Sequence, residues 1–141
     1  DFSFVPDREG VAVANRVEGG KRPRSSMAPT LVYAPDGTLV LAIGAAGGGT
    51  IPVQVAKALI GVIDWGLPVE DAIGLPGLYA PGDTITVEEG SPLLAMRAEL
   101  EALGHTLQER RLPFKANAAQ LVAGQWTGAA DPRSEGLAII P

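Results

Sequence analysis

Residues 21–50 of the chain read KRPRSSMAPTLVYAPDGTLVLAIGAAGGGT. Two β-prone runs, at 30–34 and 39–43, are joined by Pro-Asp-Gly, a turn sequence whose glycine tolerates a positive φ. Two adjacent serines precede the first run, and three consecutive glycines follow the second. The stretch therefore predicts a β-hairpin flanked by a pair of hydroxyl groups and a glycine-rich loop.

A helix is predicted directly after the glycines. Thr50 can cap it, Pro52 lies in its first turn, and apolar residues recur at helical spacing until DWGLP ends the pattern. These apolar residues are Val55, Ala58, Leu59, Val62 and Ile63. Because they form one apolar face, we expect this helix to pack on the hairpin.

The remaining segments predict short elements. Residues 1–24 are rich in proline, glycine and charge, so we expect an irregular surface segment. Further along, we expect a short helix at 68–73, a strand at 83–90, a helix with a serine cap at 91–105, strands at 106–110 and 118–124, and a closing loop at 127–134. Helices interleaved with hairpin-like strands predict an α/β (α+β layered) class in a single domain, residues 1–141.

Composition excludes several classes of function. The net charge is −5 and the basic residues are scattered apart from those at 21–24, which disfavours nucleic-acid binding. No apolar run reaches the roughly 18 to 20 residues of a membrane span. The chain has no cysteine, so disulfides, thiol catalysis and cysteine-ligated zinc are excluded. Its one histidine, His105, follows a predicted helix end and is expected to face solvent rather than serve a catalytic triad.

The glycines and serines each allow two interpretations. GAAGGGT at 44–50 lies between a predicted strand and a predicted helix, where backbone N–H groups can bind an anion or an oxyanion. The loop lacks the lysine and the spacing of nucleotide-binding loops, and a plain tight turn explains the same glycines. Ser25 and Ser26 can likewise be ordinary loop hydroxyls that bond their own backbone.

Three other residues are assigned structural roles. Arg133 is interpreted as a partner of Asp131 that locks the closing loop. Trp65 and Trp126 are interpreted as core or interface residues rather than stacking platforms.

The chain resembles the small subunit of the γ-glutamyltranspeptidase family over nearly its whole length. KRPRSSMAPT at 21–30 is similar to the family's K-R-P-x-S-S-M-x-P-T motif, and the hairpin, glycine pair and helix follow in the same order. DFS at 1–3 and DPRSEG at 131–136 are similar to the D-D-F-S and D-P-R-S segments of that subunit. Cephalosporin acylases and capsule-processing transferases share this superfamily.

The resemblance implies an N-terminal nucleophile hydrolase, with a four-layer αββα sandwich. In this family a precursor cleaves itself, and the new N-terminal threonine attacks a γ-glutamyl amide such as that of glutathione, with its own α-amine as the base. Gly47 and Gly48 match the glycine pair whose N–H groups stabilise the oxyanion. Ser25 and Ser26 match the pair that binds the α-carboxylate of the glutamyl group, and Asp1 matches the carboxylate that binds its α-ammonium.

The resemblance also implies partners. It predicts no cofactor and no metal, and a periplasmic or extracellular location. The chain shows no Thr-Thr-His-like nucleophile segment, so we expect it to need the missing N-terminal part of the small subunit and a large subunit from the same precursor. It departs from the family at Ala45, Ala46 and Thr50 around the glycine pair, and at Arg24, all of which change the pocket wall and leave the backbone donors intact.

Three functions therefore remain open. The first is transfer or hydrolysis of γ-glutamyl groups, and the second is an acylase of the same fold that acts on glutaryl or cephalosporin side chains. The third is a non-catalytic relative that kept the scaffold. They differ in whether the upstream segment begins with threonine and in whether the substrate's α-ammonium is used.

Overall fold

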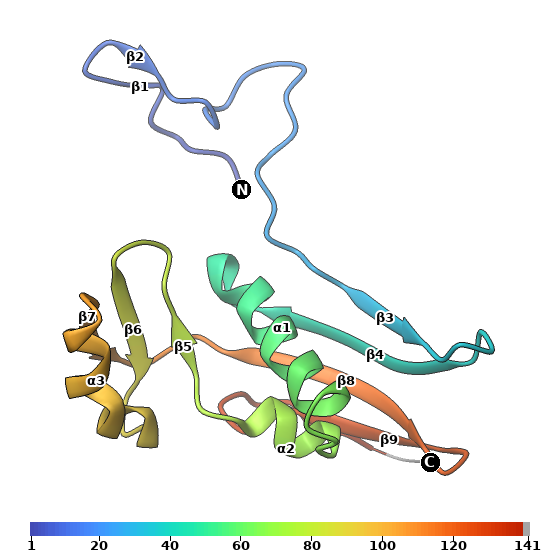
Figure 1. Ribbon diagram of the computed structural model, residues 1–141. Helices are drawn as coiled ribbons and strands as arrows, with labels where there is room; N and C mark the ends of the chain where they lie inside the picture. Colours follow the sequence, from blue (N-terminus) through green and yellow to red (C-terminus); the bar gives the residue numbers. More distant parts are fainter. Residues whose placement is uncertain (140–141) are drawn as a thin grey trace.

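The predicted hairpin forms one side of a four-stranded antiparallel sheet in the computed structural model, which describes residues 1–139. Strand β3 (Thr30–Tyr33) pairs with β4 (Leu39–Ala46). Strand β4 pairs with β8 (Lys115–Val122), and β8 pairs with β9 (Gln125–Ala130) (Figure 1). Because β4 lies inside the sheet, its carboxyl end, where the glycines follow, is fixed by β8.

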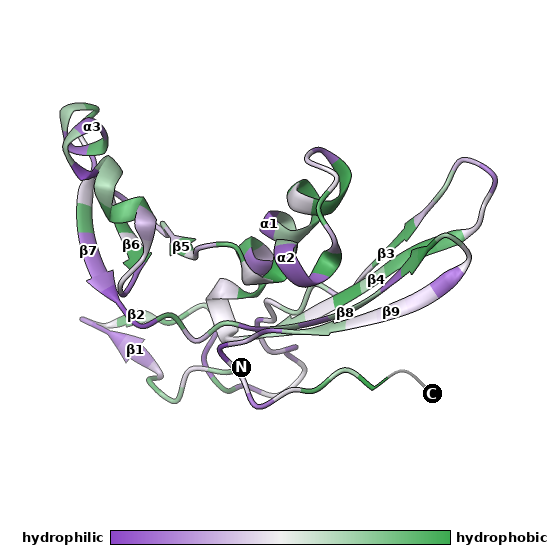
Figure 2. Ribbon diagram, turned by 90° about the horizontal axis from the view of Figure 1, so that it is seen from below, coloured by the Kyte–Doolittle hydropathy of each residue, from purple (hydrophilic) through white to green (hydrophobic). Residues whose placement is uncertain are grey.

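Two helices cover one face of this sheet (Figure 2). They are α1 (Ile51–Ile63) and α2 (Val69–Gly74), as the sequence predicted. Alternate residues of the strands meet them, because successive side chains of a strand point to opposite faces. The resulting core consists of Leu41, Ile43, Val55, Ala58, Val69, Ile73, Ala116 and Ala129.

The opposite face of the four-stranded sheet carries no helix within residues 1–139 (Figure 2). The register places small side chains along its middle, including Ala42, Gly44 and Ala119. Leu31, Tyr33 and Trp126 are each about half exposed. A hollow of about 640 Å³ opens there between β3, β4 and β8. The chain thus supplies one helical layer and one sheet layer.

A second, three-stranded sheet lies beside the first (Figure 1). Strand β5 (Leu78–Tyr79) runs antiparallel to β6 (Thr84–Glu88), and β6 runs parallel to β7 (Thr106–Arg110). The crossover between β6 and β7 contains the 3₁₀ helix η2 (Pro92–Met96) and α3 (Arg97–Ala102). The predicted serine cap is confirmed, because the Leu93 amide donates to Ser91 Oγ at 3.1 Å.

Three local predictions need correction. The helix expected at 91–105 is split, because the Ser91 carbonyl accepts from the Leu94 amide at 3.1 Å, a 3₁₀ bond that opens the segment. Residues 1–24 contain two short paired strands, β1 (Asp7–Arg8) and β2 (Val11–Ala12). The loop expected at 127–134 is strand as far as Ala130, because residues 127–130 complete the ladder with β8. Among the described residues, no helix is long and apolar enough to cross a bilayer.

Candidate functional site

The glycine loop lies where the sequence predicted it, between β4 and α1. Gly47 has φ +132° and Gly48 has φ +60°, both in the region that favours glycine. Gly48–Thr50 form a 3₁₀ turn, η1, that runs directly into α1. Within residues 1–139, the amides of Gly47 and Gly48 donate no hydrogen bond. The loop therefore offers two backbone donors beside a helix N-terminus, an arrangement suited to an oxyanion.

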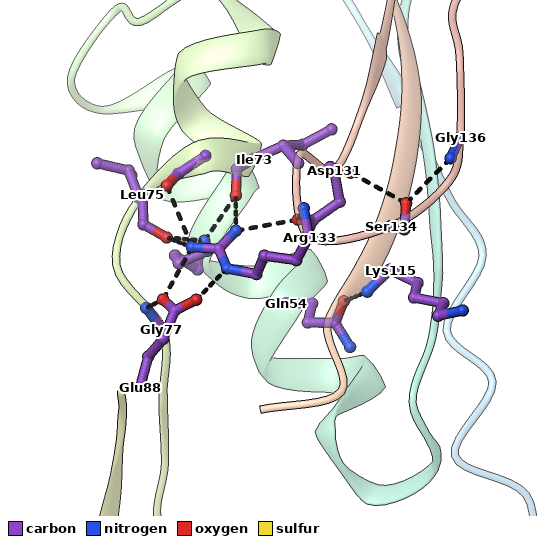
Figure 3. A network of polar contacts seen from close by, with 12 residues as sticks. Gln54, Ile73, Leu75, Gly77, Glu88, Lys115, Asp131, Arg133, Ser134 and Gly136 are labelled. Carbon is purple, nitrogen blue, oxygen red and sulfur yellow. Dashed lines mark hydrogen bonds and ion pairs between the residues drawn. The ribbon is translucent and has the colours of Figure 1, made fainter. Parts of the chain in front are cut away.

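A buried glutamine holds this loop. Gln54, with 1% of its surface exposed, donates from Nε2 to the Ala46 carbonyl at 2.9 Å and to Thr50 Oγ1 at 3.0 Å. Its Oε1 accepts from the Lys115 amide at 2.8 Å, which ties the loop to β8 (Figure 3). Thr50 is the residue before α1, but its hydroxyl makes no cap bond and instead donates to the Gly47 carbonyl at 3.0 Å.

Asp1 and the serine pair lie close together. Asn15 joins them, because its Nδ2 donates to the Asp1 carbonyl at 2.5 Å and its Oδ1 accepts from the Arg24 amide at 3.0 Å. The backbone nitrogen of Asp1 also donates to the Arg24 carbonyl. Arg24 directly precedes Ser25, so these bonds place Asp1 beside the serines.

The two serines have different surroundings. Ser25 is exposed, and its hydroxyl oxygen accepts from the Met27 amide at 3.2 Å. Ser26 is half-buried. No hydrogen bond within residues 1–139 joins the serines or Asp1 to the glycine loop, and Figure 1 draws Asp1 on the N-terminal segment, on the side of the body where α1 begins. The structure thus places the two glycines in one loop, and it brings the backbone of Asp1 to the residue that precedes the serines.

A hollow of about 580 Å³ adjoins the carboxyl end of β4, on the helix-free face of the sheet. Gly44, Ala45 and Ala46 form its β4 side, and Asn117 and Lys115 lie across from them on β8. Lys115 Nζ forms an ion pair with Glu135 at 3.1 Å. The space beside the glycine loop is therefore lined mainly by small and polar residues.

Arg133 forms the largest polar network in the described chain (Figure 3). Its Nη1 pairs with Asp131 at 3.0 Å, which confirms the predicted loop-locking contact. It also reaches Glu88 on β6, with Nη2 to Oε2 at 2.9 Å, and donates to the Leu75 carbonyl at 2.8 Å. Arg133 thus links β6, the end of α2 and the segment after β9.

The network changes the pKa of its members. The hydrogen bond from Arg133 lowers the pKa of Glu88, and the hydrogen bond to Glu88 raises the pKa of Arg133. Lys57 on α1 donates to the Ile73 carbonyl at 2.8 Å and to the Leu75 carbonyl. Burial, assisted by the nearby charge of Arg133, lowers the pKa of Lys57 to about 8. Lys57 and Arg133 are therefore structural cations, and neither belongs to the glycine loop.

The other assigned residues lie on the surface. His105 is exposed, as predicted. Trp65 and Trp126 are 63% and 44% exposed, so the core interpretation of the two tryptophans is wrong for this chain. An interface role for them stays a prediction.

Comparison with known proteins identifies the family. Residues 1–140 match the family model described as gamma-glutamyltranspeptidase. The chain belongs to this family. It is 34% identical to a glutathione hydrolase proenzyme of Pseudomonas aeruginosa, an alignment that covers 99% of the chain and 27% of that protein. A glutathione hydrolase proenzyme of Escherichia coli is also 34% identical, with 95% of the chain and 24% of that protein covered. The chain thus spans about a quarter of the length of these curated relatives.

Solved structures agree with the family assignment. The gamma-glutamyltranspeptidase of Pseudomonas nitroreducens, complexed with L-DON, superposes with a TM-score of 0.80 at 30% identity. That superposition covers 99% of this chain and 77% of the other chain. A cephalosporin acylase from Bacillus halodurans has the same fold, with a TM-score of 0.78 at 22% identity over 98% of this chain and 26% of its own. The predicted layered α/β class is therefore confirmed.

Sequence reasoning missed three residues, two that organise the site and one, Glu88, that organises the fold around it. Asn15 holds Asp1 near the serines, but nothing in the sequence around Asn15 indicates this contact. Glu88 lies 45 residues from Arg133, so spacing could not pair them. Gln54 did leave a signal, because it is a polar residue on the buried stripe of a helix otherwise marked by Ile51, Val55 and Ala58.

Proposed function

We propose that this chain forms the oxyanion-binding and glutamyl-binding part of an enzyme that transfers or hydrolyses γ-glutamyl groups. One observation carries the proposal: Gly47 and Gly48 present two amides that are unpaired within residues 1–139, from a backbone that needs glycine at both positions. Hydrogen bonds aimed at a developing oxyanion act only in the transition state, and each is worth about 3 to 4 kcal/mol in comparable sites. Membership of the family supplies the reaction class.

The reaction needs a nucleophile that this chain does not offer among its assigned residues. We propose that an N-terminal threonine attacks the γ-carbonyl of the substrate, with its own amine as the base. The carbonyl oxygen becomes an oxyanion that accepts hydrogen bonds from Gly47 and Gly48. When the C–N bond breaks, the leaving amine of the substrate takes the proton that the threonine amine removed from its own hydroxyl. The acyl-enzyme then passes its γ-glutamyl group to water or to an amino acid. Glutathione is a substrate of the required chemistry.

Substrate recognition falls to Asp1 and the serine pair. The zwitterionic head of a glutamyl group needs donors for its carboxylate and a carboxylate for its ammonium. Ser25 and Ser26 provide the hydroxyls, and Asp1 provides the carboxylate. Their closeness, which Asn15 maintains, supports this role. Such a site rejects analogues that lack either charge, because its own polar groups would then stay unpaired.

We also propose the assembly and the location. The curated relatives are named proenzymes. The proposed partners are the remaining part of the small subunit and the large subunit, both from the same precursor. We place the small-subunit part on the helix-free face of the sheet. The proposed location is periplasmic or extracellular, which cell fractionation tests.

An acylase with the same fold is the second candidate. One relative, the acylase ACY 1 proenzyme of a Pseudomonas species, is 31% identical over 85% of the chain and 22% of its own length. An acylase for glutaryl side chains uses the same oxyanion loop but gains nothing from the carboxylate of Asp1. The donor's α-ammonium therefore separates the two candidates.

The serine pair tests the proposed function. The variant Ser25→Ala with Ser26→Ala, in the assembled enzyme, is expected to raise KM for a γ-glutamyl anilide, because each lost bond to a charged group costs about 1.5 to 3 kcal/mol. Steady-state kinetics measure KM, and circular dichroism checks the fold. An unchanged KM in an active, folded variant refutes the assignment of the serines, and a wild-type assembly with no amide-cleaving activity refutes the function.

A further inference from the structure

We propose that Gln54 and Thr50 are positioning residues that aim the two oxyanion donors. The inference rests on the proposed function, since it concerns the same glycine loop. The two side chains bind the carbonyl groups of the loop and not its amides.

Two carbonyl groups of the loop, those of Ala46 and Gly47, accept hydrogen bonds from buried side chains. The Ala46 carbonyl accepts from Gln54 Nε2 at 2.9 Å. The Gly47 carbonyl accepts from Thr50 Oγ1 at 3.0 Å and from the Thr50 amide at 3.3 Å. Gln54 is 1% exposed and Thr50 is 5% exposed, so bulk water does not compete with these two side chains for the carbonyl groups.

The peptide geometry converts these bonds into an orientation of the amides. No cis peptide bond occurs within the described residues, and in a trans peptide the C=O and N–H groups point in opposite directions. A carbonyl of Ala46 held by Gln54 therefore turns the Gly47 N–H away from Gln54. In the same way, a carbonyl of Gly47 held by Thr50 turns the Gly48 N–H away from Thr50. Both amides face away from the buried pair.

The two side chains act as one unit. Gln54 Nε2 also donates to Thr50 Oγ1 at 3.0 Å, which leaves the Thr50 proton free to go to the Gly47 carbonyl. Gln54 Oε1 is occupied by the Lys115 amide of β8, so the amide group of the side chain has one orientation. A chain of hydrogen bonds thus connects Lys115 of the sheet, through Gln54 and Thr50, to the glycine loop. Preorganised donors of this kind avoid reorganisation during the reaction.

The test uses the assembled, processed enzyme and a γ-glutamyl anilide. Thr50→Val removes the hydroxyl and keeps the shape, and we expect kcat to fall about 10-fold to 100-fold with KM within about twofold, because donors that act only in the transition state change kcat. Thr50→Ser keeps the hydroxyl and is expected to restore kcat to within about threefold. Gln54→Met removes all three bonds and is expected to lower kcat at least as much as Thr50→Val.

Gln120→Met is the matched control. Gln120 Oε1 accepts from the Val69 amide at 2.9 Å, so this variant also removes a glutamine-to-backbone bond in the same body. It lies outside the glycine loop, and we expect a lowered Tm with kcat unchanged. If Gln120→Met lowers kcat as much as Gln54→Met, loss of stability explains the effect and the inference is overturned. A Thr50→Val variant with full kcat also overturns it.

A second readout does not depend on activity. Crystal structures of the assembled Thr50→Val variant and of the wild type are expected to differ in the orientation of the Gly47–Gly48 peptide. An unchanged peptide in the variant overturns the inference even if the wild type cleaves no γ-glutamyl or glutaryl anilide, an outcome that would refute the proposed function separately.

Discussion

Gly47 and Gly48 are adjacent but physically different. A Cβ at Gly47 would lie 2.5 Å from the Pro113 carbonyl oxygen and 2.6 Å from Thr50 Oγ1, inside van der Waals contact. A Cβ at Gly48 would meet no atom within 4 Å. Gly47 is therefore required by both its φ and its crowded surroundings, whereas Gly48 is required by its φ alone.

This difference predicts an order of stability. Gly48→Ala places a side chain in the left-handed region at a cost of about 1 to 2 kcal/mol. Gly47→Ala adds overpacking against backbone, which contributes about 1 to 3 kcal/mol more and displaces Thr50 and Gln54. Thermal unfolding of the assembled protein is expected to show a clearly lower Tm for Gly47→Ala than for Gly48→Ala. Equal Tm values, or the reverse order, would contradict this explanation of the loop.

At the scale of elements, Arg133 connects three parts of the chain. It contacts Glu88 on β6, the carbonyls at the end of α2 and Asp131 after β9. The side chain of Arg133 is 17% exposed and that of Glu88 is 20% exposed, so the pair is largely shielded from solvent. Glu88 also accepts from the Gly77 amide at 2.8 Å. The pair therefore fixes the smaller sheet against the larger one.

Glu88→Gln tests this connection through its pH dependence. At pH 7 the variant is expected to lose about 2 kcal/mol of stability, because Arg133 stays largely buried and loses one of its two carboxylate partners, while Asp131 remains. The folded state lowers the pKa of Glu88 below its ordinary value of 4.5, so the stability from Glu88 is present above pH 4.5 and is lost as the pH falls through the folded-state pKa. Denaturant unfolding from pH 7 to pH 3 should show the gap between wild type and variant narrowing below pH 4.5. A gap that stays constant would show that the charge of Glu88 contributes nothing.

The sequence predicted those elements whose signals are local. The Pro-Asp-Gly turn was sufficient to predict the hairpin, and the helical spacing of the apolar residues at 51–63 was sufficient to predict α1. Strand β9 was missed at residues 127–130 because Thr-Gly-Ala-Ala has little β propensity, and the strand depends on its ladder with β8. The Arg133–Glu88 pair and the Asn15 bridge were missed for the same reason, since both depend on contacts between distant parts of the chain.

At the scale of the whole molecule, one face of the sheet is covered by helices, and the other carries, among the described residues, only the segment after β9 along its β8–β9 side. The helices bury the first, whereas Leu31 and Trp126 are 56% and 44% exposed on the second. The chain also spans about a quarter of the length of its curated relatives. The helix-free face is consistent with contact with the rest of a longer precursor, as proposed above.

Leu31→Lys tests this contact. A charge in the middle of a buried apolar interface is costly, so the variant is expected to lower the Tm of the assembled protein clearly. Leu103→Lys is the control, because Leu103 is 75% exposed at the end of α3, away from this sheet. Equal Tm values for the two variants would place the contact elsewhere.

The α-ammonium of the donor is the group that separates the proposed function from its alternatives, and Asp1 is the residue proposed to bind it. Asp1→Asn keeps the size of the side chain and removes its charge. For a donor with an α-ammonium, loss of one partner of a desolvated ion pair costs about 2 to 5 kcal/mol, a fall in kcat/KM of roughly thirty-fold to several thousand-fold. A glutaryl donor has no ammonium and is expected to lose little.

The decisive measurement is kcat/KM of the assembled enzyme for a γ-glutamyl anilide and a glutaryl anilide, in wild type and in Asp1→Asn, with Tm recorded for both proteins. We expect the γ-glutamyl value to fall by the stated factor while the glutaryl value and Tm stay nearly constant. An equal fall for both donors would make Asp1 a scaffold residue, and a wild type that cleaves only the glutaryl donor would contradict the proposed γ-glutamyl function.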